Sequence, residues 1–220
     1  MIKIGSWWAP DNTIIVNSMV LEEKFTCLEP LEKAFKYVKR FDNAIDIGTW
    51  IGDSANYIAK RFSSVIGFEA NPEVYECCIK NLSERNLKNC NVSNIGISNS
   101  SGKKILFNGK SNFSGWISEK TEYDISISNN FLIDTIPLDD LNLTNIDFLK
   151  IDVDSHEGFL LDGARNFLTV NSPVILIENK TRIHKERQPL DMPDPVKILE
   201  SLGYIMVEKV AKADFIYIKG

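Results

Sequence analysis

The sequence lacks the features that mark several classes of protein. Its 25 Lys and Arg residues are fewer than its 30 Asp and Glu, giving a formal net charge of −5, so we expect no nucleic-acid partner. No apolar run approaches the roughly 20 residues that a membrane-spanning helix needs. Residues 1–10 are too polar and interrupted for the apolar part of a signal peptide. These absences favour a cytoplasmic protein.

Cysteine is also scarce, and its spacing excludes two kinds of site. Cys27, Cys77, Cys78 and Cys90 contain no Cys-x-x-Cys pair. The pattern therefore favours reduced thiols over a disulfide framework or a zinc centre.

Strand-like and helix-like patterns alternate along the chain. Strands are expected over 44–47, 65–68, 91–95, 148–153 and 173–178, with a terminal hairpin over 204–207 and 215–218. Helices are expected over 30–39, after Gly52, from Pro72, over 159–170, and from Pro195 to Gly203. This order predicts an α/β fold: a mostly parallel, seven-stranded sheet between two layers of helices, with an antiparallel strand from the hairpin.

The domain organisation is simple in this interpretation. We expect one domain over residues 41–220, preceded by an extension and first helix over residues 1–40. Between residues 99 and 131 the periodicity gives way to Ser, Asn, Gly and Lys. We predict a hairpin there, together with a mobile loop over residues 108–130 that covers the site.

A glycine-containing turn after the first strand is the most informative motif. The pattern is Asp46-x-Gly48-x-x-x-Gly52, and Glu69 ends the next strand. Glycine allows a tight turn and a close approach to a ligand. A carboxylate about 20 residues further on can accept hydrogen bonds from both hydroxyls of a ribose. The motif favours an adenosine-bearing cofactor over an ordinary strand–helix turn.

The spacing of the glycines favours one such cofactor. Dinucleotide sites use Gly-x-Gly-x-x-Gly to place a pyrophosphate on a helix N-terminus. Here Trp50 and Ile51 stand where open backbone would be needed, and Asp53 would repel a diphosphate. S-adenosylmethionine has no phosphate and carries sulfonium and ammonium cations. It is therefore favoured over a nicotinamide or flavin cofactor.

The later strands carry a more specific set of motifs. Leu-Lys-Ile-Asp-Val-Asp-Ser-His-Glu-Gly occupies 149–158 and Leu-Asp-Gly-Ala occupies 161–164. Leu-Asp-Asp-Leu precedes them at 138–141, and Pro-Val-Ile-Leu-Ile-Glu follows at 173–178. In this order the motifs resemble the FkbM type of class I S-adenosylmethionine-dependent methyltransferases. Ser155 departs from the family, which usually has glycine there.

The resemblance covers roughly residues 41 to 180 and implies O-methylation of a hydroxyl on a sugar, glycan or small metabolite. It places Asp46 and Gly48 near the methionine part of the cofactor and Glu69 at the ribose. The implied contacts to adenine come from Ala70, Asn71, Asn94, Ile95 and Gly96. The other candidate cofactor residues are Thr49, Trp50, Gly52, Asp53, Ser54 and Asp152.

Methyl transfer to a hydroxyl needs a group that takes the proton, and a well-placed base contributes about 10²–10⁴-fold. Asp152 and His156 are the candidates, because both follow a buried strand at the expected ligand edge. Glu157 is a further candidate, although an acid in a first helical turn also stabilises the helix dipole. For His156 the structural alternative is a loop or helix-capping histidine.

Candidate substrate contacts are Glu178, Asn179, Arg182, His184 and Trp116. The basic segment that contains Arg182 and His184 can instead be a solvated face, and Trp116 can instead pack in the core. Asp152, Glu178 and Asn179 form a weaker alternative as metal ligands, as in catechol-type O-methyltransferases, although the family implies no metal.

A different class of function remains open on sequence grounds. The chain could be a non-catalytic protein that binds S-adenosylmethionine and docks a partner through Trp7 and Trp8. A homo-oligomer is also compatible with the sequence.

Overall fold

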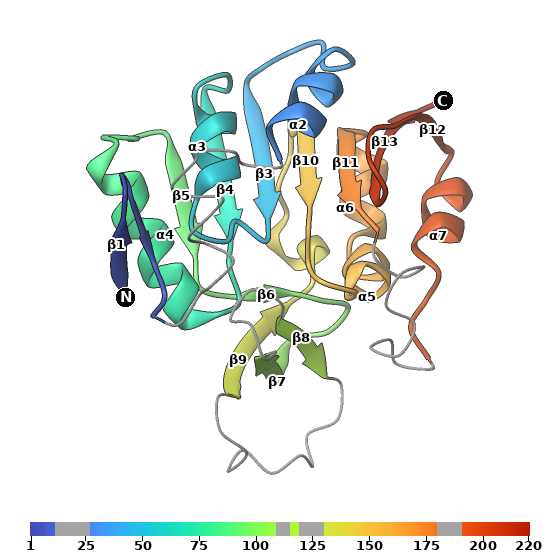
Figure 1. Cartoon of the computed structure of the whole chain (residues 1–220). Helices are drawn as coiled ribbons and strands as arrows, with labels where there is room; N and C mark the ends of the chain where they lie inside the picture. Colours follow the sequence, from blue (N-terminus) through green and yellow to red (C-terminus); the bar gives the residue numbers. More distant parts are fainter. Residues whose placement is uncertain (12–26, 109–114, 119–129, 180–190) are drawn as a thin grey trace.

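The computed structural model describes residues 1–11, 27–108, 115–118, 130–179 and 191–220 of the chain (Figure 1). The predicted mobile loop over 108–130 lies largely outside these residues, so it stays a prediction. Among the described residues, no helix has the length and apolar character needed to cross a membrane.

A seven-stranded sheet forms the centre of the fold. Its strands are β3 (Asn43–Ile47), β4 (Ser64–Phe68), β5 (Cys90–Ser93), β10 (Phe148–Ile151), β11 (Val174–Glu178), β12 (Tyr204–Lys209) and β13 (Asp214–Lys219). Their spatial order is β12-β13-β11-β10-β3-β4-β5. The pairs from β11 to β5 are parallel, whereas β13 runs antiparallel to both β11 and β12. The predicted fold class and its antiparallel strand are confirmed.

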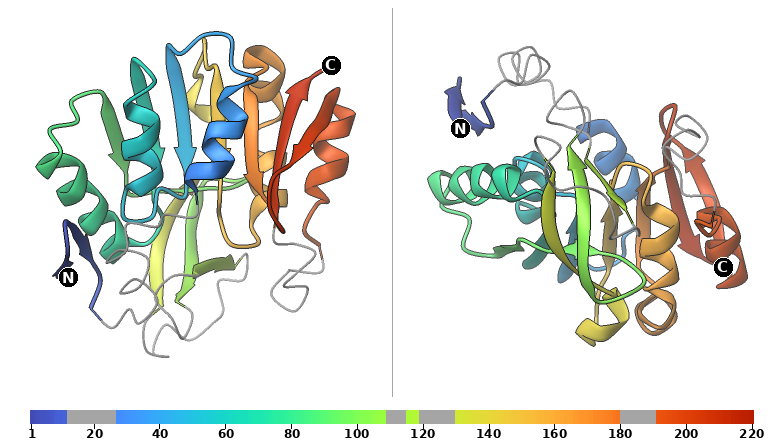
Figure 2. Two further views of the ribbon diagram at one scale, coloured as in Figure 1. Left: turned by 45° about the horizontal axis from the view of Figure 1, so that its top comes forward. Right: turned by 90° about the horizontal axis from the view of Figure 1, so that it is seen from below.

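Helices cover both faces of this sheet (Figure 2). They are α2 (Leu28–Phe35), α3 (Asp53–Ala59), α4 (Pro72–Glu84), α5 (Glu157–Asp162), α6 (Arg165–Asn171) and α7 (Pro195–Ser201). Successive strand residues point to opposite faces, so β10 sends Leu149 and Ile151 toward α5, α6 and α7, and Phe148 toward α2, α3 and α4. The central strands are therefore apolar on both sides, which explains their continuous hydrophobic runs.

A second, four-stranded sheet lies at the carboxyl edge of the first (Figure 1). It consists of β6 (Gly96–Ile97), β7 (Gly102–Asn108), β8 (Gly115–Ser118) and β9 (Phe131–Ile136), in the order β6-β9-β7-β8. The 3-10 helix η1 (Leu138–Leu141) leads from it to β10. The expected hairpin is the β7–β8 pair. The expected strand over 91–95 ends at Ser93, because Gly96 and Ile97 pair with β9 instead.

Two helix starts were readable from single residues. Asn71 caps α4 by accepting the backbone N–H groups of Glu73 and Val74. Asp194 caps α7 in the same way, and a proline follows each cap at the first helical position. Both expected starts are confirmed.

The single helix expected over 159–170 is wrong: the segment forms α5 and α6 with a break between them. At the break, a Cβ on Gly163 would lie 2.1 Å from the backbone oxygen of Ser98, so the chain passes too close for a side chain. The Asp139 carboxylate then accepts the N–H groups of Asn166 and Phe167, at 3.1 and 2.7 Å. A distant acid thus caps the new helix.

The N-terminal residues form a hairpin of β1 (Ile2–Ile4) and β2 (Trp7–Ala9) that packs on α4. Trp7 is only 4% exposed, and Trp8 is half-buried. The expected docking patch is therefore wrong for Trp7, because this chain covers that side chain itself, and Trp8 is partly covered.

Candidate active site

The turn after β3 is held in place by its neighbours on the sheet. Gly48 has a φ of +80°, and a Cβ there would lie 1.8 Å from the backbone oxygen of Asp152. The N–H groups of Gly48 and Thr49 donate to the Phe68 oxygen at the end of β4. Gly52, with a φ of +92°, is the N-cap residue of α3. Glycine at 48 is thus required by the close packing of two strand ends.

Glu69 follows β4 and faces this turn. Its Oε2 accepts the backbone N–H of Trp50, and its Oε1 accepts that of Asn71, both at 2.9 Å. Burial raises the pKa of the Glu69 carboxyl to about 7, against the opposing effect of those two hydrogen bonds. Each carboxylate oxygen can accept a second hydrogen bond. The arrangement therefore fits the predicted contact to two ribose hydroxyls.

Asp46 is fully buried inside the sheet, below the turn. Its Oδ2 accepts the Ser54 hydroxyl at 2.6 Å, and its Oδ1 lies 3.2 Å from the Nζ atom of Lys150. Burial raises the pKa of Asp46, although the charge of Lys150 opposes the shift. Oδ1 is buried without a hydrogen bond to any described residue, and the contact of Asp46 with the methionine part of the cofactor stays a prediction.

Lys150 is a buried charged residue beside the turn that sequence reasoning missed. Besides Asp46, its Nζ atom contacts the Gly48 backbone oxygen at 3.3 Å and lies 3.9 Å from Asp152 Oδ2. Burial lowers the pKa of Lys150, but the combined attraction of Asp46, Asp152 and Asp53 outweighs it and the pKa is raised. The sequence did contain a signal for this residue: a lysine within an otherwise apolar strand is a buried charge, and a buried charge needs partners.

The remaining side chains of the turn point into the protein. Thr49 lies against Cys78, with 3.5 Å between Oγ1 and Sγ. Asp53 accepts a hydrogen bond from the Cys27 thiol at 3.1 Å, and burial raises the pKa of Asp53 to about 6. Any contact of these two residues with a ligand would come from the backbone.

The predicted adenine side lies between β5 and the small sheet. The Asn71 side chain is occupied as the cap of α4. Asn94 is exposed, and its Nδ2 donates to the Ala70 backbone oxygen at 3.2 Å. Ile95 packs on the main core and Gly96 is buried in the small sheet. The structure thus brings these residues to one edge, although their contacts to adenine stay a prediction.

His156 lies inside the protein, away from an open surface. It is 1% exposed, its Nε2 lies 3.0 Å from the Ser98 hydroxyl, and its ring packs on Phe159. Burial, aided by the charge of Lys104, lowers the pKa of His156 to about 3. Lys104 also donates to Ser98 at 3.0 Å. This burial and low pKa argue against His156 as the base, a role that stays a prediction.

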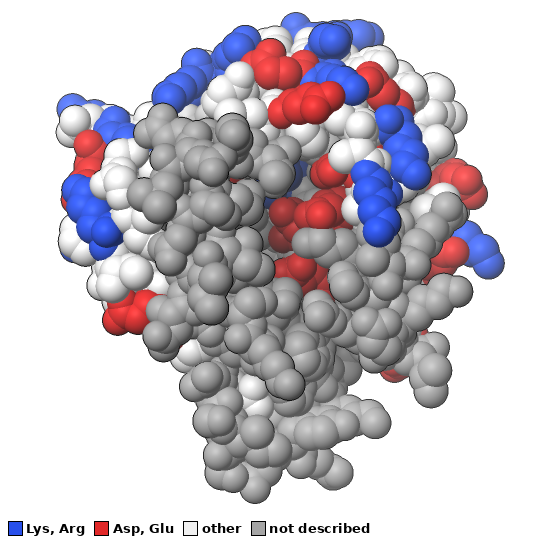
Figure 3. Space-filling view, in the orientation of Figure 1, with Lys and Arg blue, Asp and Glu red and all other residues white. Residues whose placement is uncertain are grey.

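Glu157 is the most buried of several acids near the end of β10. Its Oε1 accepts the Ser155 backbone N–H at 3.1 Å, while Oε2 is buried without a hydrogen bond. Burial raises the pKa of Glu157 to about 7, and the nearby Asp152 and Asp154 add to the shift. Acidic side chains also gather in the middle of the face in Figure 3. Such surroundings fit a cationic ligand group better than a phosphate.

The predicted substrate residues are only partly described. Glu178 ends β11 half-buried, and the following Asn179 is buried. Trp116 lies in β8, paired with residue 107, whereas Arg182 and His184 lie outside the described residues. In the described part of the chain, no group of three or more His, Cys, Asp or Glu side chains is placed to hold a metal ion.

Comparisons with known proteins agree with this geometry. The family model described as the methyltransferase FkbM domain matches residues 46–206. The structure of methyltransferase FkbM from Methylobacillus flagellatus KT superposes with a TM-score of 0.55 at 20% identity, over 96% of this chain and 55% of that one. The chain thus spans about half the length of that protein.

Two further solved structures share the fold. A putative rRNA methylase from Clostridium thermocellum has a TM-score of 0.51 at 11% identity, covering 89% of this chain and 97% of that one. Precorrin-6y C5,15-methyltransferase from Geobacter metallireducens GS-15 has a TM-score of 0.50 at 10% identity, covering 99% and 96%. No curated protein matches the sequence significantly.

The family model spans more than half of the 220 residues, and the fold is that of class I methyltransferases. The predicted family and cofactor are confirmed. The chain belongs to the FkbM methyltransferase family and is an S-adenosylmethionine-dependent methyltransferase.

Proposed function

We propose that this enzyme methylates a hydroxyl group of a sugar, glycan or small metabolite, and that Asp152 takes the hydroxyl proton. The observation that carries the proposal is the position of Asp152. It directly follows β10, and its backbone oxygen touches the turn at Gly48. Its side chain is 36% exposed, in contrast to the buried Asp46 and His156. An accessible carboxylate therefore stands beside the cofactor turn.

The cofactor site in this proposal is built from the turn and the two strand ends beside it. Glu69 holds the ribose hydroxyls, while Ala70 and Asn71 border the adenine. Because Gly48 and Thr49 are tied to the end of β4 by hydrogen bonds, the turn needs little reorganisation to receive a ligand, which limits the entropic cost of binding. When bound, S-adenosylmethionine supplies a methyl group on an electrophilic sulfonium.

Asp152 acts on the acceptor in this scheme. A hydroxyl is a weak nucleophile. As its oxygen forms a bond to the methyl carbon, the carbon–sulfur bond would break and release S-adenosylhomocysteine, and the hydroxyl proton would pass to the Asp152 carboxylate. Proton removal by a positioned base contributes about 10²–10⁴-fold, and alignment of the reacting atoms contributes several kcal/mol more. The Nζ atom of Lys150 lies 3.9 Å from Asp152 Oδ2 and so helps to place this carboxylate beside the turn.

The acceptor class is supported by the FkbM membership together with the carboxylate at the end of β10. The alternative of a non-catalytic binding protein has lost the feature that favoured it, since Trp7 is buried by α4. The metal-dependent alternative would need Asp152, Glu178 and Asn179 to act together.

A labelled-cofactor screen tests this proposal. Purified protein is incubated with S-adenosylmethionine labelled on the methyl group and with sugar nucleotides, glycans and hydroxylated metabolites. We expect label on an acceptor oxygen, with activity unchanged by EDTA. Label on nitrogen or carbon would overturn the hydroxyl assignment. Activity abolished by EDTA and restored by Mg²⁺ would replace the base with the metal alternative.

A further inference from the structure

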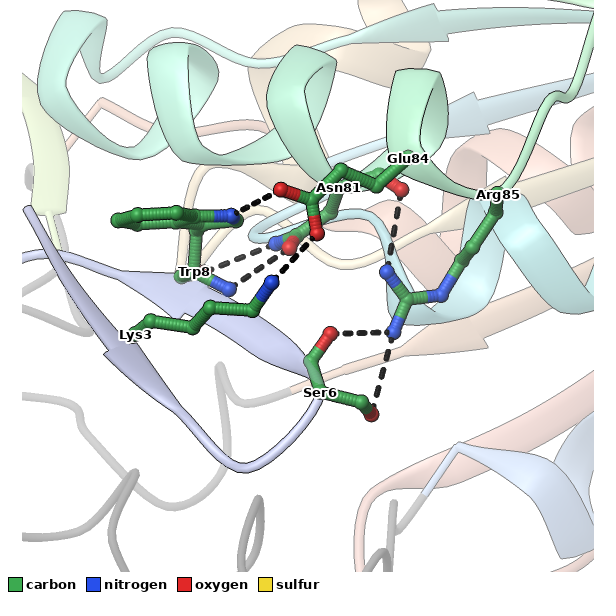
Figure 4. Close-up of polar contacts among 6 residues, drawn as sticks. All are labelled: Lys3, Ser6, Trp8, Asn81, Glu84 and Arg85. Atoms are coloured by element: carbon green, nitrogen blue, oxygen red, sulfur yellow. Dashed lines mark hydrogen bonds and ion pairs between the residues drawn. The ribbon is translucent and has the colours of Figure 1, made fainter.

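The N-terminal hairpin lies outside the residues that match the family model, yet it is firmly bound to α4 (Figure 4). Lys3 forms an ion pair of 2.9 Å with Glu84, and the indole N–H of Trp8 donates to the same carboxylate at 2.7 Å. Arg85 donates to the Ser6 backbone oxygen at 3.0 Å. These contacts hold the hairpin against one side of the helix.

Asn81 joins the hairpin to the cofactor turn. This residue of α4 is fully buried, and its side-chain amide contacts both the hairpin and the turn. Oδ1 accepts the Trp8 N–H at 2.7 Å, and Nδ2 donates to the Trp8 oxygen at 2.8 Å and to the Ile51 oxygen at 2.9 Å. One side chain thus fixes the hairpin backbone and the turn between Gly48 and Gly52 in a single orientation.

An apolar cluster reinforces the same junction. Ile51 is fully buried, and it packs in one cluster with Trp7, Val74 and Cys77. Trp50 is half-buried against that cluster, and its backbone N–H is the group that Glu69 accepts. The hydrogen bonds therefore run from the hairpin through Asn81 to the Ile51 oxygen, and the N–H of the preceding residue, Trp50, donates to Glu69.

We infer that the N-terminal hairpin is the outer support of the cofactor turn and that Asn81 is a positioning residue for S-adenosylmethionine binding. The inference rests on the proposed place of the ribose at Glu69. It does not depend on the acceptor, because its test measures cofactor binding alone. A failure to methylate any hydroxyl would therefore leave it standing.

The test compares two variants of the full chain, Asn81→Asp and Asn89→Asp. Asn89 donates from Nδ2 to two backbone oxygens at the far end of α3, that of Ala59 at 2.8 Å and that of Phe62 at 2.9 Å. Each substitution replaces two amide donors with an acceptor, so both should lower the melting temperature. Calorimetry with S-adenosylhomocysteine should show a dissociation constant raised about tenfold only in Asn81→Asp. An unchanged dissociation constant in Asn81→Asp, or an equal change of that constant in Asn89→Asp, would overturn the inference.

Hydrogen exchange on the unaltered protein gives a second test that does not require a variant to fold. If the hairpin and the turn are coupled, ligand binding at the turn must stabilise the hairpin in return. We expect S-adenosylhomocysteine to slow exchange of the backbone amides over residues 2–9, including that of Trp8. Exchange in the distant β12–β13 hairpin should not change. Protection at the turn with none over residues 2–9 would contradict the inference.

Discussion

The Asp152 backbone oxygen occupies the space that a side chain at position 48 would need, with 1.8 Å between that oxygen and an ideal Cβ on Gly48. This relationship couples the cofactor turn to the strand end that carries the proposed base. The glycine is therefore needed for packing between β3 and β10 as well as for the approach of a ligand. Lys150 strengthens the same junction, because it contacts the Gly48 oxygen and both neighbouring acids.

Gly48→Ala should destabilise the protein and abolish cofactor binding, because the new Cβ collides with backbone that cannot rotate away. Gly203→Ala is the matched control: its φ is +76°, but the nearest atom to its Cβ, on flexible Lys219, is 3.8 Å away. The control should lose about 1 kcal/mol for the left-handed backbone alone. Gly48→Ala should lose at least about 2 kcal/mol more in urea unfolding. Equal losses would show that the collision relaxes at little cost.

Ser155→Gly should stabilise the protein. Ser155 has a φ of +76°, a conformation that costs a non-glycine residue roughly 1 kcal/mol, and its side chain is buried. The FkbM family usually has glycine at this position. Thermal unfolding should show a gain for Ser155→Gly and a loss for the control Ser93→Gly, which places glycine in a strand. A loss at both positions would mean that the Ser155 hydroxyl makes a valuable contact.

Glu157→Gln should change how stability depends on pH. The pKa of this carboxyl is about 7 in the folded state against an ordinary value of 4.5, so the folded protein binds more protons between these pH values. The free energy of unfolding of the unaltered protein therefore falls as pH rises from about 4.5 to 7. The glutamine variant keeps the acceptor for the Ser155 N–H and has no charge to bury. It should be about as stable as the parent at pH 4.5 and about 3 kcal/mol more stable at pH 8. Parallel pH profiles in chemical denaturation would contradict the raised pKa.

Asp152→Asn should separate catalysis from cofactor binding. The amide keeps the size of the carboxylate but cannot take a proton, so turnover should fall by about 10²-fold or more. Affinity for S-adenosylhomocysteine should stay within a few-fold, because the side chain is proposed to face the acceptor. Turnover is measured with the acceptor found in the screen. A fully active variant would assign the proton to another group.

The sequence was sufficient to predict the seven-stranded sheet, because its strands and two of the helix caps are marked by local residue patterns. Asn71 and Asp194 precede prolines, and the β10 and β11 strands are apolar on both faces. The break between α5 and α6 was missed because it depends on Ser98, which is distant in sequence and lies in the interior beside Gly163. Local periodicity carries no information on such contacts.

The same limit applied to the site. The position of Glu69 followed from its spacing after the glycine turn, but the partners of Lys150 and Asn81 lie on other elements. The burial of His156 depends on Ser98 and on Lys104 of β7. The sequence predicted a hairpin there, but not that β9 and the two-residue strand β6 complete a sheet beside His156.

The central claim, that the cofactor binds at the glycine turn with its ribose at Glu69, is tested most directly by calorimetry with S-adenosylhomocysteine. The unaltered protein should bind it with micromolar-scale affinity and should not bind NAD. Glu69→Ala should weaken binding by roughly 1–3 kcal/mol, because two hydroxyls lose a charged acceptor. Glu73→Ala, which removes an exposed carboxylate from the first turn of α4, should bind as the parent does. Unchanged affinity in Glu69→Ala, or tight binding of NAD in place of S-adenosylhomocysteine, would contradict the account.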